Sequence, residues 1–152
     1  MKVETLEDIL VWTQALHERL SECLDHCATE HDSQQAKWLM TYLAGHERSL
    51  SNALERTLEH TDAHVLNTWV LDFIGHQPID PHRTGEASFS DMSFEEICTA
   101  VFDLHNQVID LYRHIAARAD IPDARELFGQ LLDAEHNETL LLAQQANRTR
   151  EL

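Results

Sequence analysis

Hydrophobic residues recur every three or four positions over four long stretches of the chain, while runs with a period of two are nearly absent. A spacing of three to four places apolar side chains on one face of an α-helix. The pattern therefore predicts an all-α protein. With 152 residues, 43% of them hydrophobic, the chain is long enough for one domain with its own core and too short for two, so we expect a single domain over 1–152.

Capping signals indicate where the first two helices begin and end. The first is expected to begin near Thr5, where the letters TLED have the pattern of a capping box, and to end near Glu30. The second follows HDSQ, with Asp32 as the expected N-cap and Gln35 reaching back to it. It extends to about His60.

Similar signals delimit the last two helices. The third is expected to begin at SFEE, where Ser93 and Glu96 form a second capping box, and to end near Arg118. The fourth follows DIPD, with Asp120 as the cap and a proline in the first turn, and fades near Asn147.

The connections between these helices predict the topology. Only a few residues separate the first helix from the second and the third from the fourth, which predicts two antiparallel hairpins. About thirty residues join the hairpins; their first part looks like a short helix ending at Gly75, and the rest is rich in Pro, Gly and Ser. A bundle of two hairpins joined by one long crossover is expected, because an up-down-up-down bundle needs only three short loops.

The charge balance argues against two classes of partner. Eleven Lys and Arg residues stand against 27 Asp and Glu residues, a formal net charge of −16, which repels phosphate backbones and anionic membrane surfaces. The N-terminal letters MKVETLEDILVW lack the cationic start and continuous apolar run of a signal peptide, and no segment approaches a membrane span. We therefore expect a cytoplasmic protein that binds neither nucleic acid nor membrane.

Six polar residues fall within the apolar faces of the predicted helices. They are His17, His46, Glu47, His105, Glu135 and Glu138. In the fourth helix, the two glutamates face inward while Asp133, His136 and Asn137 face outward. The fourth helix therefore carries two carboxylates that need a partner inside the bundle.

These six residues are also expected at one height along the bundle. Counted from the first hairpin turn, His17 and His46 are within one helical turn of each other. Counted from the second turn, the same is true of His105, Glu135 and Glu138. All lie near the middle of their helices, so two hairpins packed without a large stagger bring the six groups into one central layer.

Two interpretations of this layer are open. Three imidazoles and three carboxylates suit Fe, Mn or Zn, and one or two cations would offset the cost of burying the carboxylates. Alternatively, each His bonds a Glu in a metal-free polar layer that fixes the helix register. In that case the protein acts through its surface, as a homodimer or partner-binding module, with the segment 64–74 as the expected contact.

The helix order, the long crossover and the inward ligands at mid-helix resemble the ferritin-like superfamily, particularly its small rubrerythrin- and bacterioferritin-like members, over about the whole chain. The resemblance implies an antiparallel bundle holding transition-metal ions, iron before manganese or zinc, with redox or oxygen-related activity. Members supply one Glu from each of the first and third helices and a Glu-x-x-His from each of the second and fourth.

The ligand motifs of this chain depart from that pattern. His17 and His105 stand in place of the two single glutamates. The fourth helix has Glu135 followed by Glu138 where the motif has His, and the second offers either His46 or Glu47 but no complete motif. The total of six His and Glu ligands is kept, and their distribution is altered.

Overall fold

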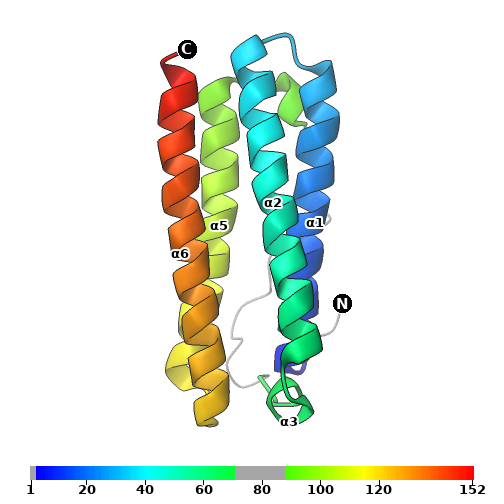
Figure 1. The fold of residues 1–152 in the computed structure, drawn as a ribbon, viewed down its shortest axis with the longest axis vertical. Coiled ribbons are helices and arrows are strands. Elements are labelled where there is room, and N and C mark those ends of the chain that lie inside the picture. The colour runs from blue at the N-terminus through cyan, green and yellow to red at the C-terminus, as the bar shows by residue number, and fades with distance from the viewer. Residues whose placement is uncertain (1–2, 71–87) are drawn as a thin grey trace.

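Four long helices form an antiparallel bundle in the computed structural model, which describes residues 3–70 and 88–152 (Figure 1). The long helices are α1 (Leu6–Glu30), α2 (Gln34–His60), α5 (Phe94–Arg118) and α6 (Pro122–Arg150), and the crossover contributes the short α3 (Ala63–Leu66) and the 3-10 helix η1 (Phe89–Asp91). α1 packs along α2 and α5 packs along α6, so the predicted all-α class and the two hairpins are confirmed.

The described parts of the crossover lie at opposite ends of the bundle. α3 follows the lower end of α2 in Figure 1, whereas η1 lies at the upper end, where the Nε2 of His31, in the α1–α2 turn, bonds the carbonyl of Met92 at 2.7 Å. As a result α2 and α5 run in the same direction, and α2 and α6 in opposite directions (Figure 1).

Side-chain caps begin three of the long helices, as expected, but one cap was assigned to the wrong residue. The capping boxes at Thr5 and Ser93 are both present, the first closed by an aspartate and the second by a glutamate. In α2, however, Ser33 accepts the hydrogen bond from the backbone of Ala36, and Asp32 is not the cap. The helix begins at residue 34, and Ser33, directly before it, has the extended backbone of a cap.

The ends of α6 also differ from the prediction. Ile121 occupies the N-cap position without a side-chain bond, and Asp120 lies outside the helix. Pro122 at the first helical position has no N–H, which removes one of the groups that a cap would satisfy. At the other end the helix continues to Arg150, where Gln35 of α2 donates to the carbonyls of Thr149 and Arg150 at 3.1 and 3.2 Å.

The short crossover helix ends sooner than predicted, at Leu66. Beyond it the backbone extends and pairs with the chain before α1: the N–H of Leu6 bonds Thr68 at 3.0 Å, and that of Val70 bonds Glu4 at 2.9 Å. Residues 68 and 70 use their backbone groups in this pairing, so the helix does not continue through them. The predicted end at Gly75 and the Pro-rich part of the crossover lie outside the described residues.

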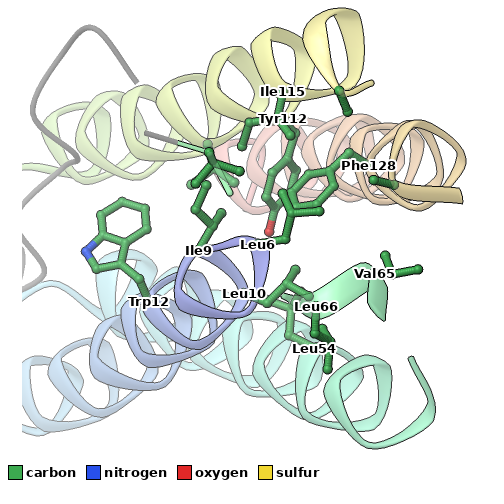
Figure 2. Packing of buried hydrophobic residues seen from close by; sticks show 14 of the residues in the cluster. Leu6, Ile9, Leu10, Trp12, Leu54, Val65, Leu66, Tyr112, Ile115 and Phe128 are labelled. Carbon is green, nitrogen blue, oxygen red and sulfur yellow. The ribbon is translucent and has the colours of Figure 1, made fainter. Parts of the chain in front are cut away.

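The hydrophobic core is divided into two clusters. The first contains, among others, Leu6, Ile9, Leu10, Leu54, Val65, Tyr112, Ile115 and Phe128, and Figure 2 shows side chains of α1 pointing toward those of α5 and α6. The second contains Leu20, Leu24, Leu39, Met40, Leu43, Ile97, Val101 and Leu142, among others. Burying each of these side chains stabilises the fold by about 1.5–3 kcal/mol. Between the two clusters, each long helix has one buried histidine or glutamate.

None of the described helices is long and apolar enough to cross a membrane.

Candidate metal centre

Four buried side chains, one from each long helix, form a closed ring at the centre of the bundle. His17 of α1 contacts Glu47 of α2 through Nδ1 at 2.5 Å and Glu135 of α6 through Nε2 at 2.8 Å. His105 of α5 contacts the other oxygen of Glu135 through Nδ1 at 2.9 Å and the other oxygen of Glu47 through Nε2 at 2.5 Å. Each nitrogen faces one oxygen, so histidine and glutamate alternate around the ring.

The ring has an approximate twofold symmetry. In each hairpin the Nδ1 of the histidine bonds the glutamate that follows 30 residues later, and the Nε2 bonds the glutamate of the other hairpin. Each hairpin therefore supplies one histidine and one glutamate, and two of the four contacts join the hairpins to each other. The ring is both a polar site and a link between the two halves of the bundle.

The number of hydrogens in the ring determines its charge. Four nitrogen–oxygen contacts need four hydrogens, and two imidazoles protonated on both nitrogens supply them. The carboxylates of Glu47 and Glu135 are then ionised, and two positive and two negative charges cancel. A lone buried charge would be costly, whereas this set of four is neutral and fully hydrogen-bonded.

The pKa values follow this charge pattern. Burial lowers the pKa of both histidines, but the charges and hydrogen bonds of the glutamates outweigh burial and raise the pKa of His17 to about 9 and that of His105 to about 10. Burial likewise raises the pKa of Glu47 and Glu135, but their contacts with the two imidazoliums lower it to about 2 for each. Metal-free, the ring is fully ionised near neutral pH.

The other two predicted ligands form a separate pair beside the ring. His46 Nδ1 lies 2.7 Å from Glu138, and the two side chains are 25% and 26% exposed, whereas those of the ring are almost completely buried. The Tyr42 ring lies over His46, with centroids 4.5 Å apart. The single layer of six groups expected from the sequence is thus resolved into an inner ring of four residues and an outer pair of two.

Comparison with known proteins places the fold. No family profile and no curated protein matches the sequence. Among solved structures, the chain is similar to a candidate ferritin-like diiron-carboxylate protein from Thermotoga maritima, with a TM-score of 0.63 over 94% of this chain and 95% of that one, at 14% sequence identity. The protein has the ferritin-like fold. This agreement confirms the fold that the sequence resemblance implied.

The donor set of this ferritin-like bundle fits a transition-metal ion. Single ligand atoms of His17, Glu47 and His105 lie within 4.8 Å of one another, and the second carboxylate of the ring, Glu135, contacts both histidines. Imidazole nitrogens and carboxylate oxygens are common ligands of Fe, Mn and Zn. Atoms that bind one ion at about 2.1 Å lie about 3 to 4 Å apart, so the ring contacts would lengthen by roughly half an ångström to admit it.

A constant offset in the sequence distinguishes the ring from the outer pair. Adding 88 to the residue number carries His17 onto His105 and Glu47 onto Glu135, and the cap Thr5 onto Ser93. The same shift carries His46 onto an alanine, and Glu138 corresponds to a leucine. This relation between the two hairpins is the signal in the sequence for the four-residue ring, and it is not visible within any one helix.

Proposed function

We propose that this protein binds one divalent transition-metal ion at the centre of the bundle, with His17, Glu47, His105 and Glu135 as its ligands. The observation that carries the proposal is the ring itself: each long helix places one buried metal-binding side chain at the same point. Bundles build metal sites in this way, from side chains on facing helices.

Charge supports the same conclusion. A histidine that binds a metal is neutral, so an ion that takes the place of two imidazolium protons leaves two neutral histidines, two carboxylates and one divalent cation. The net charge is zero before and after the exchange. Metal binding would therefore not bury a net charge, which is the largest cost at a site of this depth.

Iron is the ion we favour, with manganese and zinc as the other candidates. Two imidazoles and carboxylates suit all three metals, and the similar structure from Thermotoga maritima is described as that of a candidate diiron-carboxylate protein. A bound iron or manganese ion would supply redox chemistry, including reactions with oxygen. The ring offers ligands for one ion; a second ion would have to recruit His46 and Glu138 from their separate pair.

A second candidate function rests on the completeness of the hydrogen bonds in the ring. Every nitrogen already faces an oxygen, so the ring is satisfied without a cation. In that case it fixes the register of the helices, and the protein acts through its surface. Self-association through the segment 64–74 and a cytoplasmic location remain predictions; within that segment, Trp69 is 62% exposed and available for a contact.

Metal analysis separates the two candidates. Protein purified without chelator or metal-affinity resin is expected to contain about one Fe, Mn or Zn per chain by elemental analysis. Adding the same ion to chelator-treated protein should raise the Tm, because binding at 100 times Kd stabilises a protein by about 2.7 kcal/mol. Replacing His105 by Ala should abolish both effects, while replacing the exposed His136 by Ala should leave them unchanged.

The opposite result would identify the metal-free function. If the wild-type protein contains no metal, and none of the three ions changes its Tm, the ring is a structural lock and the metal proposal is wrong.

A further inference from the structure

The ring has no direct contact with solvent. The side chains of His17, Glu47, His105 and Glu135 are at most 3% exposed. Along the bundle axis, the ring lies between the two hydrophobic clusters, in which no carboxylate or imidazole is present. An ion that reaches the ring along the axis would have to lose its water in a largely apolar layer, at a cost of many kcal/mol.

One side of the ring differs from these apolar layers. His46 precedes Glu47 in α2, and Glu138 lies one turn after Glu135 in α6, so both members of the outer pair adjoin a ring glutamate. Their side chains join α2 to α6 at 2.7 Å and are about a quarter exposed. The pair therefore connects solvent with the ring through groups that can bind a cation.

The approximate symmetry of the bundle shows that, between α2 and α6, this polar connection exists on one side of the ring only. The twofold relation exchanges α2 with α6, and these two helices run antiparallel (Figure 1). It therefore maps the contact between them, here called the α2–α6 seam, onto itself with its upper and lower ends exchanged. The shift of 88 residues pairs His46 with Ala134 and Glu138 with Leu50. On the side of the ring toward the upper end of Figure 1, the α2–α6 seam contains His46 and Glu138. On the opposite side the corresponding positions are Ala134 and Leu50, which cannot bind a cation through their side chains.

We propose that the His46–Glu138 pair is an outer cation site through which a divalent ion reaches the ring between α2 and α6. This inference rests on the proposed metal-binding function. Imidazole and carboxylate are the same ligand types that the ring presents, and the partial exposure of the pair makes them accessible to a hydrated ion. The net charge of −16 raises the local concentration of cations at the surface. Rotation of the two side chains would then pass the ion to the adjacent glutamates.

The test compares rates with affinity. We expect the double variant His46→Leu with Glu138→Leu to bind Co²⁺ at least 10-fold more slowly in stopped-flow absorbance measurements. Release of Co²⁺ to an excess chelator should slow by the same factor, because a route changes both directions equally. The Kd and the stoichiometry should stay within about threefold of the wild-type values.

A matched control uses the ion pair on the other side of Glu47. Arg48 follows that glutamate and bonds Asp25 of α1 at 2.6 Å on the surface. The double variant Asp25→Leu with Arg48→Leu should load Co²⁺ at the wild-type rate. Circular dichroism checks the fold of each variant, and His46→Gln with Glu138→Gln replaces the leucine variant if it does not fold.

Each other outcome has a defined meaning. Unchanged loading and release rates in the outer-pair variant would overturn the route. A Kd weakened more than 10-fold, with faster release, would also overturn it, because it would make the pair part of the ion's final ligand set. Absence of Co²⁺ binding by the wild-type protein would contradict the proposed function itself, and this is measured before any variant is compared.

Discussion

The imidazole rings of His17 and His105 lie 5.5 Å apart, tilted by 44°, although each carries a positive charge in the metal-free protein. Two cations this close in a buried core are tolerable because Glu47 and Glu135 lie on either side and bond both of them. The stability of each member of the ring therefore depends on all the others.

Removing one ring member is expected to destabilise the protein strongly. Replacing Glu47 by Ala in chelator-treated protein leaves two imidazoliums with one carboxylate, and breaking a buried ion pair in this way costs about 3–5 kcal/mol. Replacing Glu138 by Ala breaks a pair that is about a quarter exposed and should cost about 1 kcal/mol or less. Urea titrations give both values. Equal losses of unfolding free energy in the two variants would show that the four ring residues do not stabilise one another more than the outer pair does.

Removing all four members together should be much less harmful. A variant with leucine or methionine at His17, Glu47, His105 and Glu135 replaces the ion network with apolar packing and joins the two hydrophobic clusters. Such replacements are often neutral or stabilising by about 1–4 kcal/mol. The comparison is again made by urea titration without metal. A quadruple variant less stable than Glu47→Ala would show that the ring contributes net stability.

The stability of the metal-free protein should depend on pH at both ends of the scale. The histidine pKa values rise from 6.5 to about 9 and about 10, so their stabilising effect is complete below pH 6.5 and is lost as the pH rises through 9 and 10. The glutamate pKa values fall from 4.5 to about 2, so their effect is complete above pH 4.5 and is lost as the pH falls toward 2.

The quadruple variant provides the reference for this measurement. Subtracting its free energy of unfolding at each pH cancels the effect of the acidic surface and leaves the contribution of the ring. That difference should be constant between pH 4.5 and 6.5 and should decrease on both sides. A difference that keeps rising above pH 7 would contradict the imidazolium assignment.

Metal binding should release protons. At pH 7 both His17 and His105 are protonated in the metal-free ring, and both must become neutral to bind a cation. We expect two protons per divalent ion, measured with a pH indicator in weakly buffered solution after addition of ZnCl₂. The apparent affinity should rise about 100-fold per pH unit below pH 9. Release of no protons would show that the ion binds outside the ring.

The hydroxyl of Tyr112 gives a prediction about the first hydrophobic cluster. It is completely buried, and within the described residues it forms no hydrogen bond of regular geometry; the hydroxyl of Thr13, which lies nearby, donates to the carbonyl of Ile9. Replacing Tyr112 by Phe removes an unsatisfied polar group and should raise the free energy of unfolding by about 1 kcal/mol. Tyr42→Phe at a half-buried position serves as the control. A loss of stability would show that the hydroxyl is satisfied in solution.

Much of the architecture was predictable because it depends on local signals. Helical periodicity and the capping boxes at Thr5 and Ser93 placed the helices within a few residues, and the lengths of the connections gave the topology. The cap of α2 was misassigned by one residue, since Asp32 and Ser33 are both good caps and only the backbone conformation decides between them.

The candidate site was predictable in composition but not in geometry. Successive residues of a helix point about 100° apart, so His46 and Glu47 cannot both face the bundle axis, and the same holds for Glu135 and Glu138 at a difference of about 60°. Which residue of each pair faces inward depends on a small rotation of α2 and α6, set by packing between hairpins. Helical wheels drawn one helix at a time contain no information about that rotation.

The twofold arrangement of the ring also has a consequence for the origin of such a bundle. Each hairpin contains a histidine and, 30 residues later, the glutamate that it bonds, so one hairpin supplies two of the four ring residues. A peptide with the length of one hairpin could form the same four-residue ring by associating with a second copy of itself. Joining two copies in one chain would leave the ring intact and allow each half to differ elsewhere, as the two ends of the α2–α6 seam differ here.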